Sequence, residues 1–257
     1  MMYVVLGMHK SGTSLVSQIL HRSGIHMGDG FEEGGSYDDG NQWERRDAFL
    51  INLSLCGARE EDYFSLDHYR ILNGDLPEAT ESAMRRMIDR REGTGTDWGF
   101  KEPLTCLTYA LWKRALPSHK IVAVYRSPVE VINHYGGSPR RPGRAWKALR
   151  AWSNYNRGMM GAVSESGTRS ILIRYEDLMR GEHEFSRLQK FLGRKLIDVR
   201  NPSQYRAAPK SSLYLPLDRL MSNSSSGRPS EILAQLEALR SQGAGFPGGT
   251  PVQEPNR

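Results

Sequence analysis

Cysteine is scarce in this chain, and so are long apolar runs. The 257 residues include two cysteines, Cys56 and Cys106, too few for a disulfide-framed secreted mini-domain or a four-cysteine zinc site. The longest purely apolar stretches are about five residues, as at 121–125, whereas a transmembrane helix needs roughly 20. Residues 1–7 lack the charged segment and the long apolar stretch of a signal peptide. We therefore expect a globular, cytoplasmic protein without a membrane span.

Lysine is also scarce, with eight residues against 27 arginines. The net charge is +6 and the pI is about 9.4. The planar fork of donors on arginine suits phosphate and sulfate, so this composition favours an anionic ligand. A bias in the coding DNA explains the same counts equally well. Because the basic residues are spread along the chain rather than gathered in one run, we expect no nucleic-acid partner.

Short β-branched segments alternate with helical periodicities along the chain. The pattern predicts buried strands at 3–6, 97–101, 120–125 and 170–174. It predicts helices at 13–23, 42–55, 78–91, 104–116, 128–135, 144–165, 184–192 and 230–240. Loops are expected at 28–41, 136–143 and 207–228. The alternation predicts a three-layer α/β/α fold with a central, mainly parallel sheet, as one domain over 1–242 followed by a disordered tail over 243–257.

The first predicted strand leads into a glycine loop with the outline of a phosphate-binding loop. Residues 7–14 read GMHKSGTS, close to the nucleotide-binding pattern G-x-x-x-x-G-K-[ST] between a strand and a helix. In that setting backbone N–H groups and a helix N-terminus converge on an anion. Thr13 stands where the nucleotide pattern has its lysine, and the lysine lies instead at Lys10. The shift favours one phosphate with a transferable group over a triphosphate chain; a plain turn between strand and helix is the alternative.

Three motifs, in the correct order, resemble those of sulfotransferases that use 3′-phosphoadenosine-5′-phosphosulfate (PAPS). The stretch 7–20 is similar to the loop that holds the 5′-phosphosulfate. The stretch 120–135, KIVAVYRSPVEVINHY, is similar to the strand and helix that hold the 3′ phosphate. A third stretch, ILIRYEDLM at 171–179, resembles the arginine/tyrosine strand of the family. The stretch 185–193 is similar to the helix that follows this strand in the family, and 98–112 and 148–156 further resemble bacterial members. The resemblance spans about 2–206.

The resemblance implies transfer of a sulfuryl group from PAPS to a hydroxyl or amine by in-line displacement, with 3′,5′-ADP as product and no metal. It implies two roles for Lys10, which would bind the 5′-phosphosulfate and stabilise the negative charge on the leaving phosphate. Arg126 matches the 3′-phosphate arginine, and His134 stands where the family usually has serine; an imidazole can also donate to phosphate. The implied cofactor-binding residues are His9, Lys10, Ser11, Gly12, Thr13, Ser14, Arg126, His134, Tyr175 and Arg206. Arg206 stands in for a C-terminal phosphate-binding triplet that this chain lacks, and Lys210 is the alternative for that place.

Three residues are candidates for the base that takes the acceptor proton. Glu44 resembles the glutamate that bacterial members place after an Asn-x-x-Gly-like turn, although a carboxylate at a helix start also has a purely structural use. Glu102 follows a predicted strand, where α/β proteins bind ligands, and could orient Lys10 or act as the base. His68 is the weaker third candidate. The other histidines show no metal-binding spacing, and we expect most of them at the surface: His9, His21, His26, His119 and His183.

Two other functions remain open from the sequence. A small-molecule kinase built on the same loop would need the lysine at position 13 and a magnesium carboxylate. A non-catalytic anion-binding or nucleotide-binding protein would need neither Lys10 nor a base. The acceptor expected for a sulfotransferase is a small molecule or a glycan, and neither its identity nor the oligomeric state can be read from the sequence.

Overall fold

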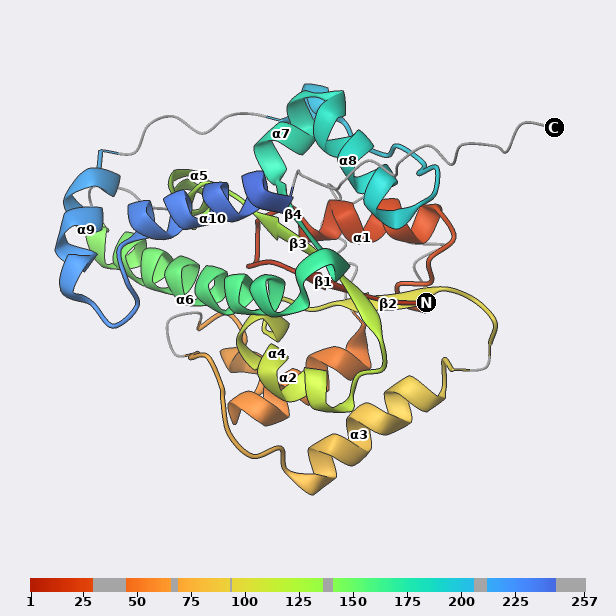
Figure 1. The fold of residues 1–257 in the computed structure, drawn as a ribbon. Coiled ribbons are helices and arrows are strands. Elements are labelled where there is room, and N and C mark those ends of the chain that lie inside the picture. The colour runs from red at the N-terminus through yellow and green to blue at the C-terminus, as the bar shows by residue number, and fades with distance from the viewer. Residues whose placement is uncertain (30–44, 66–68, 93, 136–140, 206–211, 244–257) are drawn as a thin grey trace.

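A parallel sheet in the order β2-β1-β3-β4 forms the centre of the molecule (Figure 1). The computed structural model describes residues 1–29, 45–65, 69–92, 94–135, 141–205 and 212–243. The strands within these residues are β1 (Met2–Leu6), β2 (Trp98–Lys101), β3 (His119–Tyr125) and β4 (Ser170–Arg174). Because all pairs are parallel, the carboxyl ends of the strands lie along one edge. The chain runs from β1 to β2 on one side and then to β3 on the other, so the switch point, where such sheets bind ligands, lies between β1 and β3.

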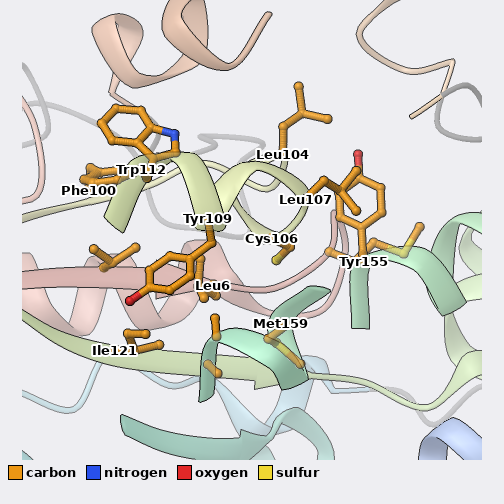
Figure 2. Packing of buried hydrophobic residues seen from close by; sticks show 14 of the residues in the cluster. Leu6, Phe100, Leu104, Cys106, Leu107, Tyr109, Trp112, Ile121, Tyr155 and Met159 are labelled. Atoms are coloured by element: carbon orange, nitrogen blue, oxygen red, sulfur yellow. The ribbon is translucent and has the colours of Figure 1, made fainter. Parts of the chain in front are cut away.

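Both faces of the sheet are covered by helices. On one face, Tyr3 and Val5 pack in a cluster with three helices: α1 (Thr13–Arg22), α7 (Tyr175–Arg180) and α8 (Glu182–Leu192). On the other face, Val4 and Leu6 share a cluster with α4 (Thr105–Ala115), α6 (Pro142–Ser166) and α10 (Pro229–Gly243). Figure 2 shows side chains of this second cluster between α4, α6 and the strands. The predicted three-layer α/β/α fold is confirmed.

The remaining helices lie around the carboxyl edge and below the second face (Figure 1). They are α2 (Arg46–Cys56), α3 (Glu78–Asp89), α5 (Pro128–His134) and α9 (Tyr214–Leu220). Short 3-10 turns lie at η1 (Glu60–Asp62), η3 (Gly167–Arg169), η4 (Pro202–Gln204) and η5 (Met221–Asn223). Within the described ranges, no helix is both long and apolar enough to cross a membrane.

The strands agree with the sequence prediction, whereas four other segments differ from it. The predicted loop 207–228 contains α9 and η5, because Leu217 and Met221 are buried in a small cluster with α5 and the start of α6. Tertiary packing of this kind stabilises a helix too short to show periodicity.

Helix α6 starts at Pro142, inside the predicted loop 136–143, since proline suits the first helical position. Helix α7 was not predicted, and Gly243 belongs to α10 rather than to the tail. The predicted loop at 30–41 and the tail at 244–257 lie outside the described residues.

Candidate active site

The glycine loop between β1 and α1 turns tightly at the carboxyl edge of the sheet. The Ser11 N–H and hydroxyl both donate to the carbonyl of Met8, at 3.2 and 2.6 Å. Among the described residues, Lys10 alone combines a side chain with a left-handed backbone, at φ 65°, and Gly12 follows at φ 96°. A Cβ on Gly12 would lie 2.0 Å from a ring carbon of Tyr175, so this position requires glycine. Successive residues in such conformations aim their N–H groups at a common point, which suits an anion.

Three cationic residues meet at this loop, one from the loop itself and two from the carboxyl ends of neighbouring strands. Lys10 belongs to the loop itself and is exposed. Lys101, the last residue of β2, is 1% exposed, and its Nζ donates to the hydroxyl of Ser14 at 3.3 Å. Arg126 follows β3 and donates to the backbone carbonyl of Lys10 at 3.2 Å. Their positive charges lie at the start of α1, where the helix dipole also favours a negative ligand.

Lys101 is a site residue that sequence reasoning missed. Lys101 ends a buried strand, one residue before Glu102. Because α/β proteins bind ligands at the carboxyl ends of their strands, this position could have identified it as a candidate site residue. A fully buried lysine is rare in the absence of an anionic partner or hydrogen bonds. Its burial next to the loop therefore adds a cation that the motif alone does not reveal.

The residues predicted to hold the 3′ phosphate and the adenine lie together beside the loop. The Arg126 guanidinium lies 4.9 Å from the centre of the Tyr175 ring and donates to Glu130 at 2.7 Å. The ring of Tyr175 covers Gly12. Burial, followed by the positive charges of Lys10 and Arg126, lowers the pKa of His134 below its usual 6.5. The structure thus brings His134 within electrostatic reach of both the loop and Arg126.

Glu102 is held in a buried hydrogen-bond network behind the loop. Its side chain is 0% exposed. Tyr63 donates to one carboxylate oxygen at 2.7 Å, and the Asn52 amide donates to the other. The Asn52 carbonyl accepts in turn from Thr108 at 2.6 Å and from Trp112 at 2.8 Å. With donors on both oxygens, this arrangement suits an anchored, orienting group.

His9 is buried, contrary to the expectation that most of these histidines lie at the surface. Its ring is 4.8 Å from that of Tyr63 and 5.8 Å from that of Tyr155, measured between centroids. Neither ring nitrogen has a hydrogen-bond partner within the part of the chain that the structure describes. Burial, followed by the charges of Lys101 and Lys10, lowers the pKa of His9 to about 3, so the ring is neutral at pH 7. The expectation is also wrong for His119, which is buried beneath Tyr109 and hydrogen-bonded to its hydroxyl at 2.8 Å.

Some predicted site residues cannot be placed relative to this arrangement. Glu44, His68 and Arg206 lie outside the described residues. Across the described ranges, no group of three or more His, Cys, Asp or Glu side chains is placed to hold a metal ion. The residues that the structure does bring together are those of the glycine loop with Arg126, His134 and Tyr175.

The sheet order, the glycine loop and the cations around it define an α/β protein with positive charge gathered at the start of α1. Residues 3–198 match the sulfotransferase family. The chain belongs to this family, and family and fold together support sulfotransferase activity.

Solved structures of sulfotransferases share the fold at low sequence identity. A sulfotransferase from Alicyclobacillus acidocaldarius is 17% identical, with a TM-score of 0.55 over 93% of this chain and 95% of that one. The sulfotransferase domain from the curacin biosynthetic pathway is 14% identical, with a TM-score of 0.52 over 91% of this chain and 96% of that one. The sulfotransferase domain of the Synechococcus PCC 7002 olefin synthase is 17% identical, with a TM-score of 0.51 over 95% and 94%. No protein of curated function matches the chain in sequence.

Proposed function

We propose that the protein transfers the sulfuryl group of PAPS to a hydroxyl or amine on a small-molecule or glycan acceptor. The observation that carries this proposal is the convergence of Lys10, Lys101 and Arg126 on a glycine loop that lacks the lysine of nucleotide kinases. Family membership supports the reaction class. The expectation of a cytoplasmic location stays a prediction.

The chain's own residues fit such a donor. The backbone of residues 9–14 would hold the 5′-phosphosulfate, because Lys10 and Gly12 turn it into a cradle that a Cβ on Gly12 would disrupt. Arg126 and His134 would hold the 3′ phosphate, and Tyr175 would pack near the adenine. When bound, PAPS supplies a sulfuryl group activated by its bond to phosphate.

Two chemical tasks then fall to side chains. Lys10 would stabilise the negative charge that grows on the bridging oxygen as the S–O bond breaks. A carboxylate would accept the proton of the acceptor hydroxyl or amine. We assign the second task to Glu44. We assign to Glu102 the orientation of Lys10, because both of its carboxylate oxygens are already hydrogen-bonded.

Nucleotide binding in the presence and absence of metal tests this proposal. We expect 3′,5′-ADP to bind more tightly than ATP, and EDTA to leave its affinity unchanged, because loop amides and side chains supply all the contacts. A kinase would bind magnesium ATP more tightly than 3′,5′-ADP, and EDTA would weaken its binding of ATP. A non-catalytic binder would retain 3′,5′-ADP but transfer no label from sulfur-labelled PAPS in a screen of hydroxyl and amine acceptors. Either of these results would contradict the proposal.

A further inference from the structure

A cationic pocket lies between the start of α2 and the end of α3. These two helices pack against each other, and Figure 1 shows where they lie below the sheet. The volume of the pocket is about 520 Å³. The side chains that line it are those of Asp29, Arg45, Arg46, Asp47, Leu50, Arg90 and Arg91. We call these residues the arginine pocket. None of them belongs to the glycine loop or to the residues assigned to the donor.

Two buried donors on side chains that line the arginine pocket have no hydrogen-bond partner among the described residues. Arg45 has a side chain that is 4% exposed, and its Nη1 has no hydrogen-bond partner among the described residues, although Nε and Nη2 both donate to Asp47. The buried Nε of Arg91 is likewise unpartnered there, while its Nη2 donates to Asp29. A buried charged group without a partner on one of its donors is costly. Both unpartnered donors belong to side chains that line the same pocket, which points to a ligand with acceptor oxygens.

The charge of the pocket favours the same ligand. Its lining carries four arginines against two aspartates, so positive charge is in excess. The hydrogen bond from Arg91 lowers the pKa of Asp29. Burial acts to raise the pKa of Asp47, but the hydrogen bond and the charge of Arg45 outweigh it, and the net pKa is lowered. Both carboxylates are therefore ionised near neutral pH. Arg46 also pairs with Glu60, which lies outside the lining, so one positive charge remains in excess for an oxyanion.

The pocket lies on the same helix as a residue of the candidate active site. Arg45 precedes the first turn of α2, and Asn52 of the same helix donates to Glu102. Seven residues of helix separate them, a rise of roughly 10 Å. The pocket therefore lies about two turns of α2 away from the hydrogen-bond network behind the glycine loop.

We infer that the arginine pocket is a second oxyanion site, which binds an acidic group of the acceptor: a carboxylate, a sulfate or a phosphate. This assignment of the acceptor rests on the proposed function, whereas oxyanion binding by the pocket does not. Arginine suits such groups because its fork of donors can contact two oxygens at once.

Inorganic sulfate is the probe for the pocket itself. The glycine loop is first saturated with 3′,5′-ADP, and sulfate is then titrated at constant ionic strength while the thermal unfolding midpoint is followed. We expect sulfate to stabilise the unsubstituted protein. Arg91→Gln should weaken sulfate roughly 10- to 100-fold, the range for losing a charged hydrogen bond. Arg90→Glu, at a side chain 63% exposed and so tolerant of change, should do the same by reversing one charge.

Arg85→Gln is the matched control, because Arg85 lies on α3, is exposed, pairs with Glu81 and does not line the pocket. Its response to sulfate should equal that of the unsubstituted protein. An equal response from all of these proteins would identify an adventitious ion only, and no response from the unsubstituted protein would exclude the site; either result overturns the inference.

A pair of acceptors that differ only in one carboxylate tests the assignment to the acceptor. Arg90→Glu should raise KM for the acidic acceptor about tenfold or more and leave KM for its neutral partner unchanged. Equal KM values for the two acceptors in the unsubstituted protein would overturn the acceptor assignment. A complete absence of sulfuryl transfer would instead contradict the proposed function and leave the sulfate titration as the test of the pocket.

Discussion

Arg126 and Lys10, 116 positions apart in the sequence, are joined by a hydrogen bond of 3.2 Å from the guanidinium to the backbone carbonyl. This bond ties the end of β3 to the loop after β1, across the switch point of the sheet. It also fixes the carbonyl of the residue whose backbone is left-handed. The shape of the glycine loop and the predicted 3′-phosphate site therefore depend on the same side chain.

Arg126→Ala should weaken binding of 3′,5′-ADP roughly 10- to 100-fold and weaken AMP much less. The reason is that only 3′,5′-ADP has the phosphate that the guanidinium would grip, and a charged hydrogen bond contributes about 1.5–3 kcal/mol. Calorimetric titration of the two nucleotides measures the difference. Arg126→Lys is the control, since it retains the charge but not the fork. Equal weakening of both nucleotides by Arg126→Ala would mean that the arginine only shapes the loop.

Lys10→Ala should lower kcat by roughly 10²–10³-fold, the range for loss of one donor that stabilises developing charge. The effect on KM for the donor should be smaller, because the charge on the bridging oxygen is greatest in the transition state. Steady-state kinetics with varied PAPS separates the two constants. A near-normal kcat with a raised KM would show that Lys10 only binds the donor.

Glu44→Gln and Glu102→Gln should have different consequences. We expect Glu44→Gln to reduce kcat by roughly 10²–10⁴-fold, as for loss of a general base, with an unchanged unfolding midpoint. Glu102→Gln should destabilise the fold by about 1–3 kcal/mol, because its amide N–H₂ would face a donor from Asn52 or Tyr63. Kinetics and thermal unfolding of both variants measure this. A large loss of kcat confined to a normally stable Glu102→Gln protein would make Glu102 the base.

The pH dependence of 3′,5′-ADP binding should reveal His134. Its pKa is lowered in the free protein, so the ring is neutral above pH 6.5 and a bound phosphate would favour its protonation. Affinity should therefore gain from proton uptake below pH 6.5, by up to about tenfold for each unit by which the phosphate raises the pKa. The phosphate of the ligand also titrates near pH 6. Because this contribution is the same in the two proteins, comparison with His134→Ser isolates the contribution of the imidazole. Calorimetric titration in two buffers of different ionisation enthalpy measures the number of protons taken up on binding. We expect the unsubstituted protein to take up more protons than His134→Ser. Equal uptake by the two proteins would show that a group other than His134 binds the proton.

The sequence was most informative where local pattern and tertiary environment agree. The strands β1, β3 and β4 contain short apolar runs that are buried, so local composition was enough to locate them. The glycine loop could be predicted because its chemistry is local to residues 7–14 and its context is a strand followed by a helix. Arg126 and Tyr175 follow strands, and a parallel sheet brings such residues to one edge.

The parts that could not be predicted depend on contacts between distant segments. Lys101 carries no pattern of its own; its role arises because β2 lies beside β1 and places it against Ser14. The hydrogen bonds of Glu102 come from α2 and the turn after it, some 40–50 positions earlier in the chain. The arginine pocket combines the residues before β2 with the start of α2, and no spacing in the sequence links them.

His9 should make the stability of the protein sensitive to acid. Its pKa is about 3 in the folded protein and about 6.5 when unfolded, so below pH 6.5 the unfolded state binds the extra proton. Stability from this residue is complete above pH 6.5 and falls as the pH drops, by about 1.4 kcal/mol per pH unit. The variant His9→Phe tests this expectation, because it keeps an aromatic ring beside Tyr63 and Tyr155 but cannot titrate.

Between pH 7 and pH 5, the free energy of unfolding measured in urea should fall by about 2 kcal/mol more for the unsubstituted protein than for His9→Phe. His119 titrates in both proteins and cancels in the comparison. Parallel pH profiles would show that the His9 ring finds a partner for its proton, and would remove the neutral imidazole from the description of the site.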